Sequence, residues 1–209
     1  TASQKWAMVV EHARAQSMRG RPVLIGTDSV ADSDAVSRAL TLTGVPHQVL
    51  NARQDEALGQ QEQSVVAQAG QAGRITVATH MAGRGTDVHL SDEAIGNGGL
   101  HVINTNLNRS RRIDRQLIGR CARQGMPGSC ETILSWEDDC WREWAGGGWL
   151  RLMVRVARAG LGGMPLRRWL CEHAQMEAEA RSRRRRWNML LTDSLMARHL
   201  AMAGREDWA

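Results

Sequence analysis

The chain has 209 residues, with 27 Lys and Arg against 22 Asp and Glu and a formal net charge of +5. That length holds one domain of ordinary size plus an appendage, and the small positive excess favours polyanionic partners only modestly. The four cysteines show no CxxC spacing, and no run of 18 apolar residues occurs, which argues against a zinc module, a disulfide scaffold or a membrane-spanning segment. No metal site is expected.

Apolar runs alternate with helical patterns along the first two thirds of the chain. Helices are predicted at 3–19, 32–43, 55–69 and 111–121. Strands are predicted at 22–26, 46–50, 75–78, 100–103 and 130–134, with a polar turn at 92–99. This alternation indicates βαβ units, and therefore an α/β fold with a mainly parallel sheet covered by helices on both faces.

The composition changes after about residue 139. Gly146, Gly147 and Gly148 predict a hinge near 145–148, although a glycine-rich surface turn fits as well. Helical spacing follows at 149–159, and residues 166–203 are almost free of helix breakers. We therefore expect a domain at 1–139 and an α-helical extension at 140–209. Because residue 1 is Thr and a helical pattern begins at once, the chain is expected to be part of a longer protein.

Two glycine-arginine segments stand out. Residues 83–87 read GRGTD after a β-branched run, and residues 119–125 read GRCARQG after a helix. Glycines let backbone approach an anion, and guanidinium groups suit the charge of a phosphoryl-transfer transition state. Taken alone, GRGTD is equally consistent with a turn whose Arg84 and Asp87 form a surface ion pair of small energy.

With the loop at 26–29, the two segments match in order the second RecA-like domain of superfamily-two motors. Longer stretches narrow this to a resemblance to the SecA family, the ATP-driven motors of bacterial preprotein translocation. The segments that carry it are 20–29, 75–87, GGLHVI at 98–103, SRRID at 110–114, 123–129 and 134–139, with weaker similarity at 174–193.

The resemblance implies a RecA-like second nucleotide-binding domain at 1–139, followed by the start of a helical scaffold. It implies that Arg84, Arg120 and Arg123 are catalytic arginine fingers that reach a nucleotide at a domain interface. The supporting nucleotide-binding residues are then Asp87, Gly85, Gln116 and Gln124. Gln116, Arg120 and Arg123 would share one face if the helix continued that far.

No GxxxxGK[ST] pattern occurs, and Lys5 is the only lysine. The resemblance therefore implies that ATP and Mg²⁺ are held mainly by a missing first domain of the same parent chain, and that this chain alone is inactive. Its implied partners are that phosphate-loop domain, preprotein, the translocon channel and anionic lipid, at the inner face of the bacterial membrane. Nucleic acid is a less favoured partner.

The chain also departs from the family pattern, which indicates a divergent member. The departures are Ala122, Met126, the segment 104–109, Arg183 and Arg185. The arginine run at 181–186 fits a solvated helix face, an anionic lipid contact or a nucleic-acid contact. Two alternative functions stay open: half of a nucleic-acid helicase or remodeller, and a non-catalytic interaction module derived from SecA.

Overall fold

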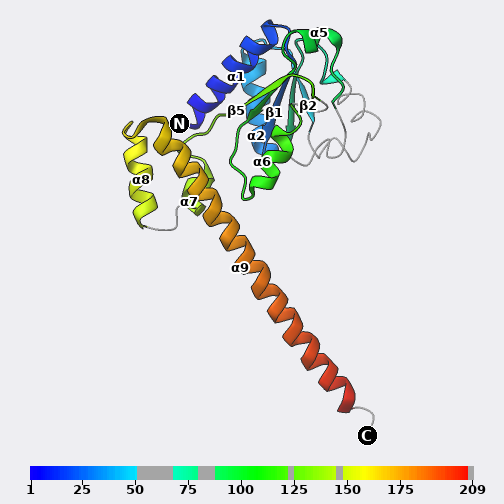
Figure 1. The fold of residues 1–209 in the computed structure, drawn as a ribbon, viewed down its shortest axis with the longest axis vertical. Coiled ribbons are helices and arrows are strands. Elements are labelled where there is room, and N and C mark those ends of the chain that lie inside the picture. The colour runs from blue at the N-terminus through cyan, green and yellow to red at the C-terminus, as the bar shows by residue number, and fades with distance from the viewer. Residues whose placement is uncertain (51–67, 80–87, 122–124, 145–147, 207–209) are drawn as a thin grey trace. The chain divides into compact units, whose positions relative to one another are not determined.

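The structure is a computed structural model that describes residues 1–50, 68–79, 88–121, 125–144 and 148–206. These divide into two compact units, Thr1–Arg142 and Glu143–Ala209, which are described separately (Figure 1). The division into domains 1–139 and 140–209 stays a prediction.

The first unit is built on a five-stranded sheet in the order β2-β3-β1-β4-β5, with every neighbouring pair parallel. The strands are β1 (Val23–Thr27), β2 (Gln48–Leu50), β3 (Ile75–Thr79), β4 (Leu100–Asn104) and β5 (Gly128–Thr132). All residues of β1, β3 and β4 are buried, as in a parallel sheet covered on both faces, whereas β5 alternates between exposed and half-buried residues. The predicted fold class is confirmed.

Helices cover the two faces of the sheet through separate apolar clusters (Figure 1). On one face, α1 (Ala2–Met18) and α2 (Val30–Leu42) pack against side chains that include Ile25, Val77 and Ile103. On the other face, α6 (Arg111–Ile118) contributes Leu117 to a cluster with Leu24 and Val102. Because successive strand residues point to opposite faces, one set of strands supplies both clusters.

Several boundaries differ from the predicted ones for local reasons. Ser29, not the later Asp-Ser-Asp cluster, caps α2, because its side chain accepts a hydrogen bond from Asp32 N at 3.0 Å. The predicted polar turn at 92–99 contains a short helix, α5 (Asp92–Gly96), capped by Ser91. A further short helix, α7 (Asp139–Trp144), follows the last strand and was not predicted. The predicted helix at 55–69 lies mostly outside the described residues.

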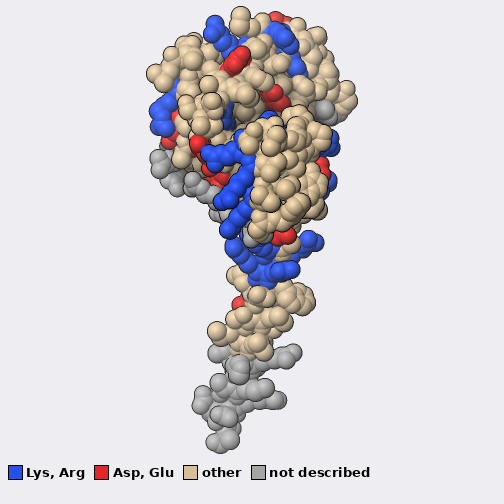
Figure 2. Space-filling view, turned by 90° about the vertical axis from the view of Figure 1, so that its left-hand side faces the viewer, with Lys and Arg blue, Asp and Glu red and all other residues tan. Residues whose placement is uncertain are grey.

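The second unit contains α8 (Gly148–Arg158) packed on α9 (Gly163–Glu206). Pro165 lies in the first turn of α9, where its missing N–H leaves no hydrogen bond unmade, so the helix begins earlier than predicted. Arg183–Arg186 are exposed, and Arg181 lies 4.0 Å from Glu177, in the part of α9 where Figure 2 shows blue side chains gathered. Within the described ranges, no helix is both long and apolar enough to span a membrane.

A polar network ties α1 to the edge of the sheet. Glu131 on β5 lies 2.9 Å from His12 Nδ1 through one oxygen and 2.9 Å from His101 Nε2 through the other. The remaining ring nitrogen of His101 lies 2.7 Å from Ser129 Oγ. Burial acts to raise the pKa of the Glu131 carboxyl, but the hydrogen bonds with His101 and His12 outweigh it, so the net pKa is lowered.

This shift predicts a pH-dependent contribution of Glu131 to stability. A carboxylate with a lowered pKa stabilises the fold above its unfolded-state pKa of about 4.5, and that contribution disappears as the pH falls through the folded-state pKa. Glu131→Gln should therefore reduce the free energy of unfolding at about pH 6 and have a smaller effect at about pH 3.5. Urea unfolding at both pH values measures this. An equal effect at both would contradict it, and Glu11→Gln, at an exposed carboxylate of α1, is the control.

Candidate functional site

The carboxyl edge of the sheet has a switch point at β1 and β4. The chain places β2 and β3 on one side of β1, then returns to add β4 and β5 on the other. In open parallel sheets, ligands bind in the crevice that forms outside the carboxyl ends of the strands at such a point. β1 and β4 end at this edge with Thr27 and Asn104, and β3 ends at the same edge with Thr79.

The loop after β4 is held in place by hydrogen bonds from the side chains of Thr105, Asn106 and Asn108. Thr105 donates through its hydroxyl to Gly26 O at 2.8 Å, which fastens the loop to β1. Asn106 Nδ2 donates to Asp32 Oδ2 at 3.0 Å, which bridges the loop to α2. Asn108 Nδ2 donates to Asp114 Oδ1 at 2.7 Å, inside α6. The stretch that departs from the family pattern is therefore hydrogen-bonded to β1, α2 and α6.

The only lysine belongs to the same network. Lys5 Nζ donates to Asn106 Oδ1 at 3.1 Å and lies 2.8 Å from Asp138 Oδ1, with 3% of its side chain exposed. The other carboxylate oxygen of Asp138 accepts a hydrogen bond from Ser135 N at 2.8 Å. Lys5 thus joins α1, the loop after β4 and the segment after β5. Its ammonium group contacts Asn106 and Asp138, so its role is structural.

The predicted site residues fall into two groups. Arg84, Gly85, Asp87, Arg123 and Gln124 lie outside the described residues. Gln116 and Arg120 are described.

Gln116 is exposed on α6, and Arg120 is partly buried in the turn that follows it. The helix ends at Ile118, because Arg120 N bonds to Leu117 O and Cys121 N to Ile118 O in tighter turns. The helix therefore stops short of Arg120, so the condition for a helical face shared by Gln116 and Arg120 is not met.

The turn with Arg120 lies beside the beginning of β5. A side chain added at Gly128, the first residue of β5, would overlap the carbonyl oxygen of Cys121. The amino end of a strand is therefore next to Arg120, whereas residues 80–87 follow the carboxyl end of β3. α6 begins after the loop that leaves the carboxyl end of β4, and the turn after it lies beside the amino end of β5. The helix therefore runs along most of the height of the sheet, which is about 13 Å for strands of five residues.

The described loops differ in how well they suit phosphate. The turn from β1 to α2 suits it poorly, because Asp28 follows the strand and Asp32 occupies the first helical turn. The start of α6 suits it better, because arginines at 109, 111 and 112 surround it. Guanidinium groups, not a lysine, are therefore the described side chains that fit the phosphates of ATP.

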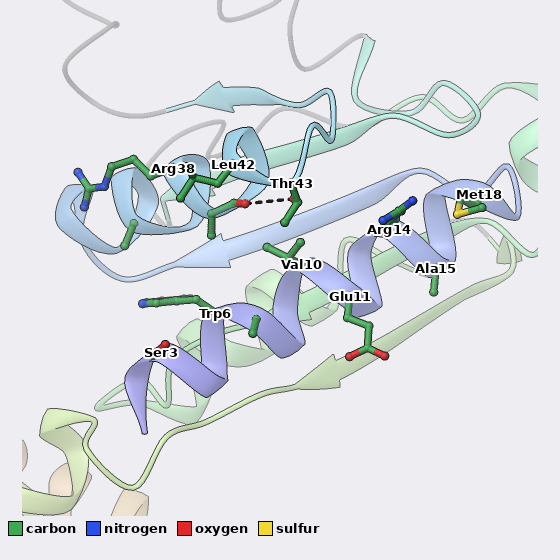
Figure 3. A pocket seen from close by; sticks show the side chains of 13 residues that line it. Ser3, Trp6, Val10, Glu11, Arg14, Ala15, Met18, Arg38, Leu42 and Thr43 are labelled. Atoms are coloured by element: carbon green, nitrogen blue, oxygen red, sulfur yellow. Dashed lines mark hydrogen bonds between the residues drawn. The ribbon is translucent and has the colours of Figure 1, made fainter.

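An apolar groove of about 980 Å³ lies between α1 and α2 (Figure 3). Val10 points from α1 toward α2, whereas Glu11 points away. Its lining comes from Ser3, Trp6, Ala7, Val10, Glu11, Arg14, Ala15, Met18, Ala35, Arg38, Ala39, Leu42 and Thr43, and includes none of the predicted site residues. The groove is therefore separate from the candidate phosphate site.

Comparison with known structures supports the fold. The DEAD-box protein SrmB of E. coli, solved in complex with the regulator of ribonuclease activity RraA, aligns with a TM-score of 0.53 at 20% identity. The alignment covers 66% of this chain and 74% of that one. At this identity the likeness shows the fold alone, a RecA-like α/β domain.

Comparison of sequences gives the family. A family model described as the SecA P-loop domain matches residues 1–96 and 91–159. The chain belongs to the SecA family.

Protein translocase subunit SecA 3 of Magnetococcus marinus is 46% identical over 97% of this chain. Protein translocase subunit SecA of Chlamydia abortus is 46% identical over 92% of it. The chain spans 30% of the length of the first relative and 20% of the second.

The family match corrects two expectations. The assignment to a second nucleotide-binding domain, opposite a separate phosphate-loop domain, is wrong, because the domain that matches is the SecA P-loop domain itself. The expectation that the chain is inactive because the ATP-binding part lies elsewhere is wrong for the same reason. The first inference rested on the order of three short loops and the second on the absence of one short motif, whereas the family match extends over residues 1–159. ATP and Mg²⁺ are accordingly assigned to this domain.

Sequence reasoning missed the residues that hold the site together. Lys5 and Asp138 are 133 positions apart, and Asn106 and Asp32 are 74 apart, so no local pattern links them. A signal was present for Asn106, because the segment 104–109 was noticed as a departure from the family. No local pattern indicates which residues the asparagines of this segment contact.

Proposed function

We propose that this chain is the ATP-binding motor domain of a SecA-type preprotein translocase. The observation that carries the proposal is the match of the SecA P-loop domain to residues 1–159. The parallel sheet of RecA-like topology supports it, because such sheets place a ligand crevice at the carboxyl edge. The relatives are named protein translocase subunits, so the proposed partners are preprotein and the translocon, at the inner face of the bacterial membrane.

In this proposal, arginines contact the phosphates of ATP. Because the sequence has no GxxxxGK[ST] pattern and Lys5 is held by Asp138, we assign the positive charge at the phosphates to arginines. These are Arg84, Arg120 and Arg123, together with the arginines at 109, 111 and 112 around the start of α6. Gly85 allows the backbone to approach closely, Asp87 orients an arginine or contacts the nucleotide, and Gln116 and Gln124 add polar contacts. Mg²⁺ accompanies the ATP and neutralises phosphate charge.

Calorimetry with ATP and Mg²⁺ on this chain tests the proposal. We expect saturable binding and a loss of affinity of about tenfold or more in Arg120→Gln, since a hydrogen bond to a charged group contributes about 1.5–3 kcal/mol. Arg38→Gln, at an exposed arginine on α2, removes the same charge and should leave the affinity unchanged. Absence of binding by the unmodified chain would reject the proposal, and equal loss in both variants would reject the role of Arg120.

A further inference from the structure

Two cysteines lie on the same face of the sheet. Cys121 is 7% exposed and packs in the same apolar cluster as Val102. Cys130 is exposed on β5, directly opposite Val102 in the parallel register. Both thiols therefore border the same residue of β4, although one comes from the turn after α6 and the other from β5.

Gly128 explains why the two segments approach so closely. A Cβ atom added at Gly128 would lie 3.2 Å from Cys121 Cβ and would overlap the Cys121 carbonyl oxygen, so only glycine fits there. Residues two apart on a strand share a face, so Cys130 lies next to Gly128 on the face that Cys121 contacts. The strand register and the close packing at Gly128 therefore place the Cys121 and Cys130 side chains on the same part of this face.

We propose that Cys121 and Cys130 form a reversible disulfide when the chain meets a peroxide or a small-molecule disulfide. With hydrogen peroxide, the Cys130 thiolate attacks one oxygen, becomes a sulfenic acid and releases hydroxide, which takes up the thiol proton as water. The Cys121 sulfur then attacks Cys130 and displaces a second hydroxide, which leaves as water with the Cys121 proton. Two thiols lose two electrons, and one peroxide becomes two waters.

The surroundings of the two thiols set this order of events. Burial raises the pKa of the Cys121 thiol, and the nearby Cys130 raises it further, so Cys121 is a poor first nucleophile toward an oxidant in solution. Cys130 is exposed, and Cys121, on the same face of the sheet, is the thiol that would attack the oxidised sulfur. Redox-sensing cysteines are typically exposed and placed next to such a resolving thiol.

The other two cysteines provide internal controls. Cys140 is buried, and burial raises the pKa of the Cys171 thiol to about 11, which leaves it almost fully protonated near neutral pH. Both should remain reduced at a peroxide concentration that oxidises Cys130.

The disulfide would tie the turn that carries Arg120 to the sheet. Closing a loop of ten residues removes conformational freedom from the unfolded chain, so the oxidised form should unfold at a temperature higher by about 5 °C. A change of ATP affinity on oxidation is also expected, and that consequence rests on the proposed function.

Peptide mapping by mass spectrometry after mild peroxide treatment, with thiol alkylation, tests the pair directly. We expect a linked peptide containing Cys121 and Cys130, reversed by dithiothreitol, with Cys140 and Cys171 still alkylated. Cys130→Ser, at an exposed position, should abolish both the link and the rise in Tm, whereas Cys171→Ser should keep both. Over-oxidation of Cys130 with Cys121 still free, or a link to another cysteine, would overturn the proposal.

Calorimetry with ATP on the same samples tests separately whether the disulfide forms and whether it changes the affinity for ATP. A linked peptide with ATP affinity changed in the unmodified chain, and unchanged in Cys130→Ser, supports the disulfide and its effect on the Arg120 turn. A linked peptide with unchanged ATP affinity rejects the effect on the turn and leaves the pair established. A linked peptide without any ATP binding counts against the proposed function alone.

Discussion

Asp138→Asn is expected to lower the free energy of unfolding by about 3 kcal/mol, the largest stability effect we predict for a substitution that preserves side-chain shape. The variant keeps the size of the side chain but leaves the ammonium of Lys5 without its counter-charge. Lys5 has 3% of its side chain exposed and lies 4.6 Å from the ring centre of Trp6. Water therefore cannot replace the lost carboxylate, and Asn106 offers only a neutral oxygen at 3.1 Å.

A double-mutant cycle in urea unfolding measures this effect. Lys5→Met removes the charge while keeping the apolar stem, so Lys5→Met combined with Asp138→Asn should be more stable than Asp138→Asn alone. Glu11→Gln changes an exposed carboxylate on the same helix as Lys5 and should shift stability by no more than about 0.5 kcal/mol. If Asp138→Asn is no worse than Glu11→Gln, the buried pair is not a significant part of the fold.

The sheet could be predicted from the sequence because its strands are short apolar runs between turn residues. Val23–Thr27 and Ile75–Thr79 are fully buried, so their composition alone distinguishes them from the surrounding helices. The order of the strands could not be derived in the same way, because it depends on which side of β1 the chain returns to.

The helix ends were harder to predict than the helices. The sequence shows two glycines, Gly119 and Gly125, after the arginine-bearing helix, and either can end it. In the structure the helix ends before Gly119, because Leu117 and Ile118 accept the hydrogen bonds of the next turn. One turn of difference moves Arg120 off the helix, which changes the geometry expected of the site.

The polar network at the carboxyl edge was beyond sequence reasoning for a physical reason. The amide nitrogen of Asn106 donates a hydrogen bond to Asp32, and its oxygen accepts one from Lys5. These two partners lie on different helices. Such contacts depend on tertiary packing. From the sequence alone, an asparagine is as consistent with a turn as with a long-range hydrogen bond. The same reasoning explains why Lys5, the only lysine, could be noticed in the sequence but not placed.

The largest functional effect is expected for Arg123→Gln, a loss of turnover of about a thousandfold with a smaller change in ATP affinity. Arginine fingers act on charge that develops in the transition state, so their removal lowers kcat more than binding. The assay uses SecA 3 of Magnetococcus marinus with its matching segment replaced by this chain, which spans 30% of that protein. Arg38→Gln is the matched control, and equal turnover in both variants would exclude Arg123 as a finger.

A double-mutant cycle between Arg84 and Arg120 then decides whether these arginines act on the same phosphates. Arg120 lies by the amino end of β5, at the opposite edge of the sheet from the carboxyl ends of the strands. Residues that contact one ligand group show coupling energies of about 0.5–3 kcal/mol, whereas independent sites add. Coupled losses of turnover would mean that the long guanidinium side chains meet at one nucleotide. Additive losses would assign the phosphates to Arg84 and leave Arg120 as a residue of the α6 turn.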